Sequence, residues 1–287
     1  MSKASMVIPD QESLAPIPQP GEEIIATRAE WMSELWHFRE LLYFLAWRDV
    51  KVRYKQAAFG AAWAIIQPLF TMLIFTFFFG RMANIPSGGI PYPLFFYTTL
   101  VPWIYFAGTL GQGGNSLVSN APLITKIYFP RILLPASSAL SSLLDFGVGS
   151  SFLVVMMLYY RIAPSWKIVF WPLAVLDMLI VTVGISMWFA ALNVRYRDIK
   201  HVIPFMIQLG LWVSPVLYPV SYLSPRWRPL LALNPLTSVM EGFRVCLFPN
   251  RQVDWGFMAT SFGTSLVFFV IGALYFRKAE KTFADII

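Results

Sequence analysis

The chain has 287 residues, of which 57% are hydrophobic and 17% aromatic, whereas only 13% are charged. Soluble domains carry about 25% charged residues, so this composition excludes a soluble globular protein and indicates an all-α integral membrane protein. The formal net charge of +7 is typical of basic loops beside membrane spans, and we expect no nucleic-acid partner.

Residues suited to enzymatic or metal chemistry are scarce. Cys246 is the single cysteine, and the two histidines, His37 and His201, lie in different segments. We therefore expect no metal site and no catalytic residue. The sequence has no G-x-x-x-x-G-K-[ST] motif, so it cannot hold a nucleotide phosphate in the P-loop manner. Energy for any driven process must come from a gradient or from a partner.

The N-terminal part of the chain divides into two regions before the first apolar segment. Residues 1–30 are rich in proline and acids and are expected to form a disordered cytoplasmic tail. Residues 31–57 carry leucines and aromatic residues at helical spacing and predict an amphipathic helix in the membrane interface. A solvated basic segment that merely precedes a span is the alternative. The basic residues near its end are Arg48, Lys51, Arg53 and Lys55.

Residues 58–287 contain six apolar segments, each close to the roughly 20 residues that a helix needs to cross a bilayer. They predict a six-span transmembrane domain. Between the fifth and sixth segments, two short apolar pieces broken by prolines predict re-entrant or interfacial helices at the outer face. The expected spans are Ala61–Phe79, Leu94–Leu110, Leu133–Tyr159, Ile168–Leu192, Val202–Tyr218 and Phe257–Phe276.

The distribution of basic residues sets the expected orientation. If the N-terminus lies inside, the inside segments carry 15 lysines and arginines and the outside segments carry 7. The positive-inside rule then places both termini in the cytoplasm.

Acidic residues within the apolar segments are Asp145 and Asp177, and Glu241 lies in the broken outer segment. An acid in hydrocarbon is a candidate for proton coupling, but it also fits a neutral, hydrogen-bonded structural role, which we favour.

Two cytoplasmic segments are candidates for docking a soluble partner. The link between the second and third spans contains Ser119-Asn120, expected to begin a short helix that includes Leu123, Ile124 and Lys126. It could dock into a partner or rest on the bilayer. The second segment is a charged turn that serves either docking or topology alone; its charged residues are Arg195, Arg197, Asp198 and Lys200.

Aromatic residues crowd the first two spans, among them Trp63, Phe70 and Tyr97. Most are expected to face lipid or other helices, although aromatic rings also suit a channel wall on which sugars slide.

Together, these features resemble the membrane subunits of type-2 ABC exporters of polysaccharides, which serve O-antigen, capsule and wall teichoic acid. The resemblance begins near residue 31 and includes the basic N-terminal helix. Its remaining motifs are Arg195-Tyr-Arg-Asp-Ile-Lys200, Ser214-Pro215-Val-Leu-Tyr218-Pro219, Leu233-Asn234-Pro235-Leu236 and Lys278-Ala-Glu-Lys281.

The resemblance implies a homodimer in a bacterial inner membrane, bound to two separate ATPase subunits that hold ATP and magnesium. It implies that the link around Ser119–Lys126 acts as a coupling helix, and that the segment after the fifth span closes the outer end of the channel. The expected substrate is a glycan on undecaprenyl pyrophosphate or another lipid. We hypothesise that the four basic residues of the N-terminal helix meet this pyrophosphate. The residues expected at the channel or its gate are Trp63, Phe70, Tyr97, Ser214, Pro215, Tyr218, Asn234 and Pro235.

The sequence leaves two other functions open: an ABC permease for a drug or lipid, and a gradient-driven transporter that uses Asp145 and Asp177. A membrane glycosyltransferase is disfavoured because no cytoplasmic loop pairs two carboxylates.

Overall fold

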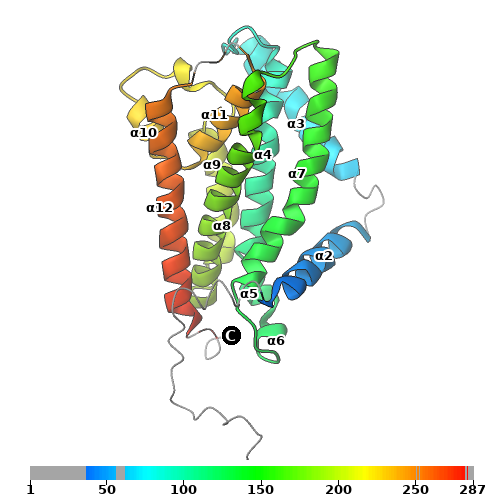
Figure 1. Cartoon of the computed structure of the whole chain (residues 1–287), viewed down its shortest axis with the longest axis vertical. Coiled ribbons are helices and arrows are strands. Elements are labelled where there is room, and N and C mark those ends of the chain that lie inside the picture. The colour runs from blue at the N-terminus through cyan, green and yellow to red at the C-terminus, as the bar shows by residue number, and fades with distance from the viewer. Residues whose placement is uncertain (1–36, 56–61, 250, 252, 282, 284–287) are drawn as a thin grey trace, which may run out of the picture. The chain divides into compact units, whose positions relative to one another are not determined.

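The regular elements of this protein are all helical in the computed structural model, which describes residues 37–55, 62–249, 251, 253–281 and 283. From Phe38 onward the described residues form one unit (Figure 1). The all-α class expected from the sequence is confirmed. The expected tail at residues 1–30, and both ends of the expected interface helix, lie outside the described residues.

Among the described residues, five helical segments are long and apolar enough to cross a membrane, which supports a multi-pass membrane protein. Their bounds match the expected spans to within several residues. They are α3 (Trp63–Phe75) with its π-helical continuation η3 (Thr76–Met82), α4 (Tyr92–Gly113), α7 (Leu133–Tyr159), η4 (Trp166–Phe170) with α8 (Trp171–Arg195), and α12 (Trp255–Glu280).

The fifth apolar segment forms α9 (Ile199–Val213), which has 15 residues. At 1.5 Å per residue this helix is about 22 Å long, shorter than the roughly 30 Å of hydrocarbon. The backbone turns extended at Ser214, so the helix ends before the prolines that follow. The expected fifth span, Val202–Tyr218, and with it the count of six therefore stay predictions.

The shorter helices gather toward the two ends of the bundle (Figure 1). We call these the α2 end and the α11 end. The interface helix expected over 31–57 is described as α2 from Arg39 to Lys55, and the two outer apolar pieces form α10 and α11. Whether those pieces re-enter a membrane stays a prediction. The short helices are α2 (Arg39–Lys55), α5 (Ser116–Ser119), α6 (Ala121–Ile124), η5 (Val220–Tyr222), α10 (Arg228–Ala232) and α11 (Leu236–Leu247).

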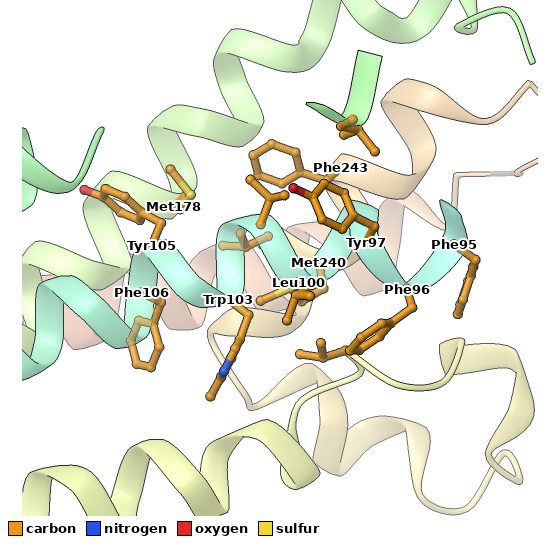
Figure 2. Packing of buried hydrophobic residues seen from close by; sticks show 14 of the residues in the cluster. Phe95, Phe96, Tyr97, Leu100, Trp103, Tyr105, Phe106, Met178, Met240 and Phe243 are labelled. Atoms are coloured by element: carbon orange, nitrogen blue, oxygen red, sulfur yellow. The ribbon is translucent and has the colours of Figure 1, made fainter. Parts of the chain in front are cut away.

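Helix α4 is the centre of the packing, and most of its residues are buried. Its aromatic side chains point in several directions around the helix and meet α8 and α11 (Figure 2). At the α11 end, Trp171 and Phe243 pack edge to face with ring centroids 4.6 Å apart, a favoured geometry for aromatic pairs. The aromatic residues of the second span therefore serve mainly as core.

Helices α8 and α12 approach each other closely at two glycines. A Cβ atom added to Gly272 would lie 2.0 Å from the carbonyl oxygen of Gly184, and one added to Gly184 would lie 2.4 Å from the Cα atom of Phe269. Small residues permit such backbone contact between membrane helices. The two helices can pack in this way only while both positions remain glycine.

Replacing Gly272 with alanine is expected to lower the melting temperature of the detergent-solubilised protein, because the new methyl group meets backbone that cannot rotate away. Overpacking of this kind costs about 1–3 kcal/mol. The control is Gly263→Ala on the same helix, where an added Cβ meets nothing within 4 Å. Equal melting temperatures for both variants would contradict the close packing.

Candidate functional site

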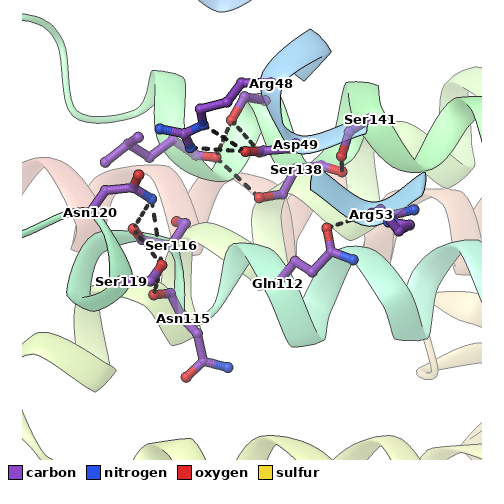
Figure 3. Close-up of polar contacts among 12 residues, drawn as sticks. Arg48, Asp49, Arg53, Gln112, Asn115, Ser116, Ser119, Asn120, Ser138 and Ser141 are labelled. Atoms are coloured by element: carbon purple, nitrogen blue, oxygen red, sulfur yellow. Dashed lines mark hydrogen bonds and ion pairs between the residues drawn. The ribbon is translucent and has the colours of Figure 1, made fainter. Parts of the chain in front are cut away.

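A polar cluster joins α2 to the bundle. Arg53 of α2 forms an ion pair with Asp145 of α7, and Tyr54 donates a hydrogen bond to the other carboxyl oxygen of Asp145. The second terminal nitrogen of Arg53 donates to the side-chain oxygen of Gln112 at 2.6 Å (Figure 3). This arrangement gives Asp145, a candidate for proton coupling, a charged partner from another helix.

The second acid of this cluster, Asp49, belongs to α2 and lies one turn before Arg53. Asp49 accepts from its neighbour Arg48 at 2.9 Å and from Ser137 of α7 at 3.5 Å (Figure 3). Burial lowers the pKa of the Arg53 guanidinium, and the negative charge of Asp49 acts in the opposite direction. Because an arginine stays protonated in proteins, Arg53 remains a fixed positive charge at this place.

A cavity of about 330 Å³ opens beside this cluster, within the range of about 300–1,000 Å³ that is usual for ligand pockets. We call it the α2 cavity. Residues of α2, α3, α4 and α7 line it: Arg53, Tyr54, Trp63, Ala64, Gln67, Pro68, Val101, Ile104, Tyr105, Gly108, Gln112, Ser142, Asp145, Phe146 and Gly149.

The four basic residues predicted to meet a lipid anchor are placed differently. Arg53 lines the α2 cavity, whereas Arg48 pairs with Asp49 on its own helix. The ammonium group of Lys51 lies 5.8 Å from the centre of the Trp47 ring, and Lys55 is exposed at the end of α2. All four remain candidates, but the structure distinguishes Arg53 as the one beside a cavity.

The link between α4 and α7 forms two single-turn helices, α5 and α6. Helix α6 begins just after Asn120, but the expected side-chain cap is not formed: Asn120 instead donates to the carbonyl of Ser116 at 2.8 Å (Figure 3). Leu123 is half-buried, Ile124 is buried and Lys126 is exposed, while Tyr128 just beyond them is 89% exposed. The tip of this link is therefore accessible to a partner.

Asn193, near the end of α8, ties this link to the bundle and was missed by the sequence analysis. Its side chain donates to the carbonyl of Gly114 at 3.0 Å and to the side-chain oxygen of Asn115 at 2.9 Å. A single asparagine near a helix end gives no sequence signal for such a contact.

The structure brings the two predicted docking segments together. Arg197 and Lys200 of the charged turn share a cavity of about 300 Å³ with Val118 and Ala121 of the link. Arg195 lines a different cavity, of about 450 Å³, with Lys278 of α12. Asp198 immediately precedes α9 and is exposed. The α5–α6 link and the charged turn thus form one surface, which we call the docking surface.

At the α11 end, the side chain of Arg244 is fully buried and organises the segment after α9. One terminal nitrogen donates to Glu241 at 2.8 Å and to the carbonyl of Tyr218 at 3.1 Å. The other donates to the carbonyl of Val216 at 3.0 Å, and the guanidinium lies 4.0 Å from the centre of the Phe95 ring. Glu241 is therefore a structural partner of Arg244. In the sequence this arginine is only one of the 7 basic residues of the outside segments.

The residues predicted at the gate meet at the same end. Asn234 donates to Ser214 at 3.0 Å and accepts from the backbone of Leu236 at 3.0 Å, so it joins the extended segment to the start of α11. Pro215 lies in the turn after α9, next to Val216, and Pro235 immediately precedes α11. This contact links two of the motifs that carried the family resemblance.

The predicted channel aromatics fall into two groups. Trp63 and Phe70 of α3 are 50% and 60% exposed. Tyr97 is fully buried in the core and donates to the carbonyl of Gly149 at 3.3 Å. A channel role stays a prediction for all three, and in this chain the first two have the exposure that it needs.

Asp177 lies deep between α8, α11 and α12 and is 4% exposed. One of its carboxyl oxygens has no hydrogen-bond partner among the described residues, and Ser238 lines the same apolar cavity of about 280 Å³. Lys167 of η4 lines this cavity as well.

Replacing Arg244 with methionine is expected to destabilise the protein strongly, because Glu241 and the carbonyls of Val216 and Tyr218 lose their donor. Removing one partner of a buried ion pair costs about 3–5 kcal/mol. Thermal unfolding in detergent measures this effect, with the exposed Arg226→Gln as control. A methionine variant that melts with the wild type would refute the assigned role.

Comparisons with known proteins agree with this architecture. A family model described as ABC-2 type transporter matches residues 40–248. The O-antigen export system permease protein RfbA of Myxococcus xanthus is 30% identical over 256 residues, which cover 88% of this chain and 97% of the relative. A protein of the same name from Klebsiella pneumoniae is 30% identical over 253 residues, covering 86% and 95%. The polysialic acid transport protein KpsM of Escherichia coli is 22% identical over 242 residues, covering 82% and 91%. The family match spans most of the chain, from α2 to the end of α11, and the chain belongs to the ABC-2 type transporter family.

Proposed function

We propose that this chain is the membrane subunit of an ATP-driven exporter that moves a lipid-linked polysaccharide across a bacterial cytoplasmic membrane. The observation that carries the proposal is the near full-length similarity to permeases named for O-antigen export, together with a similar polysialic acid transport protein. The chain itself is not an enzyme in this proposal. ATP and magnesium bind to separate ATPase subunits.

The docking surface supports an ATPase partner. It combines an accessible link, α5–α6, with the basic residues Arg197 and Lys200, and Asn193 fastens it to α8. A movement imposed on this surface would reach a membrane helix directly through that asparagine. Two ATPase copies would be needed for two permease chains.

A second copy of the chain is supported by the faces of α3 and α9. The two helices are neighbours, since the rings of Phe75 and Trp212 lie 6.3 Å apart. Each helix also exposes an amide side chain: Gln208 on α9, and Gln67 on α3 at the wall of the α2 cavity. Polar groups are costly against lipid, so this face is suited to a partner helix or a polar channel. We place the homodimer contact and the glycan path here.

Orientation and substrate class follow from charge. Basic residues gather at the α2 end, among them Lys126, Arg197, Lys200 and Lys278, which supports cytoplasmic termini and an inner-membrane location. The second half of α2 adds Arg48, Lys51, Arg53 and Lys55, of which Arg53 lines a cavity that α3 helps to form. A pyrophosphate on an undecaprenyl chain fits this setting, because its anionic head meets the cations while its tail stays in lipid.

Deletion of the gene in its own host tests the proposed function. We expect loss of surface glycan on a gel and accumulation of lipid-linked glycan in the cytoplasmic leaflet, both restored by the wild-type gene. Normal surface glycan would contradict glycan export and point to a permease for a drug or lipid. Double replacement of Asp145 and Asp177 by asparagine would abolish transport in a gradient-driven protein.

Replacing Arg48, Lys51, Arg53 and Lys55 together with glutamine is expected to reduce export, because the anionic head group loses its cations. The ATPase subunit should still copurify, since the docking surface is untouched. Surface glycan and copurification measure the two effects in one strain. The matched control replaces Arg226 and Arg228, at the α11 end, with glutamine. Unchanged export in the fourfold variant would reject the anchor role.

A further inference from the structure

Asp145 lies on α7 at a place where both of its carboxyl oxygens are satisfied by α2. Arg53 is bound to one oxygen and Tyr54 donates to the other. The contact joins α2, which is not one of the five long spans, to α7, which is one of them. Asp145 therefore fastens α2 to the bundle through the cation that also lines the α2 cavity.

This ion pair is accessible from the cavity. The side chains of Arg53 and Asp145 are 25% and 21% exposed, and both belong to the cavity wall. A partly hydrated ion pair contributes little net free energy, because desolvation offsets much of the attraction. Such a pair can exchange one anion for another without a large cost.

The Arg53 guanidinium is also held in position for a second anion. Gln112 accepts from one terminal nitrogen at 2.6 Å, which fixes the plane of the group from the α4 side. The nearby acid Asp49 is engaged by Arg48. Phosphate groups carry more charge and more acceptor oxygens than a carboxylate, and the planar guanidinium fork binds them well. A phosphate at the cavity therefore competes directly with Asp145.

The remaining cavity wall suits a lipid phosphate. Trp63 and Pro68 of α3 and Ile104 of α4 provide an apolar side, while Gln67 and Gln112 add amides. Gly108 contributes open space, since a Cβ atom there would meet only the Ser142 hydroxyl oxygen at 4.0 Å. The outer side of α3 carries exposed apolar residues such as Leu73 and Ile74. An isoprenoid chain could therefore remain in lipid while its phosphates reach Arg53.

We propose that Asp145 is an internal competitor for the substrate's anion: it occupies Arg53 in the empty permease, and the pyrophosphate of the lipid anchor displaces it. The exchange frees α2 from α7 when substrate arrives, so that the presence of substrate is transmitted to α2. This inference rests on the proposed function, because it assumes a lipid-linked anionic substrate.

The test compares two variants that break the same ion pair. The purified permease–ATPase complex in nanodiscs is titrated with farnesyl pyrophosphate, with farnesol as the uncharged probe. Asp145→Asn is expected to tighten pyrophosphate binding several-fold, because Arg53 loses its competitor. Arg53→Gln is expected to weaken it at least tenfold, and the double variant should behave like Arg53→Gln. A merely structural ion pair would shift both single variants in the same direction.

Two further variants keep the test decisive if Asp145→Asn folds poorly. Tyr54→Phe removes one hydrogen bond to Asp145 and keeps all charges, so binding should tighten modestly. Gly108→Leu fills the cavity and leaves the ion pair intact, so binding should fall. The exposed Arg226→Gln serves as the charge control and should match the wild type.

Different results would reject the anionic lipid substrate and the exchange at Arg53. If the wild-type complex binds farnesyl pyrophosphate no better than farnesol, the anionic lipid substrate itself is rejected, and the exchange with it. If the wild type prefers pyrophosphate but neither Asp145→Asn nor Tyr54→Phe tightens binding, the exchange alone is rejected and the proposed function stands.

Discussion

The buried guanidinium of Arg244 is the contact on which the α11 end depends. Beyond α9 the chain leaves helical geometry at Ser214, and the carbonyls of Val216 and Tyr218 have no helical partners. Unpaired backbone groups are costly away from water, so irregular backbone at membrane depth needs donors from the protein. Arg244 supplies them, and Glu241 balances its charge. The Arg244 side chain thus satisfies backbone carbonyls of the proline-rich segment that would otherwise be unpaired.

The two ends of the bundle use arginine in opposite ways. Arg244 is fully buried, with an aromatic ring on one face and hydrogen-bond acceptors around it, which is typical of a structural contact. Arg53 is partly hydrated, beside a cavity, with a carboxylate that another anion can replace. Burial decides which arginine is structural and which is available to a ligand.

Much of the fold was predictable from the sequence, because hydrocarbon allows few solutions. The span Leu133–Tyr159 was predicted with the same limits as α7, since a predominantly apolar run of this length is long enough for a helix that crosses the bilayer. The charged turn and the broken outer segment were also located correctly. Helix α8 nevertheless continues to Arg195, three residues beyond the expected end, because a helix does not stop where its side chains become polar.

The candidate site was predicted less completely. Arg53 and Asp145 are 92 positions apart, and no periodicity links a basic interface helix to one acid in the third apolar segment. The role of Asn193 was hidden for the same reason. For Tyr97 the residue type was informative but its environment was not. Its aromatic ring suited a channel wall, whereas in the structure it is fully buried in the core. Sequence patterns identify which residues are chemically notable, whereas their partners depend on tertiary contacts.

The glycine contact between α8 and α12 has a mechanical consequence. Where the backbones touch at Gly184 and Gly272, sliding or tilting of one helix against the other would bring backbone atoms into steric overlap. The two helices therefore behave as one rigid unit. Within a single chain, α3 and η3 are far less buried and have fewer contacts of this kind. We therefore expect any widening of the protein during transport to occur on the α3 side, while α8 and α12 stay fixed relative to each other.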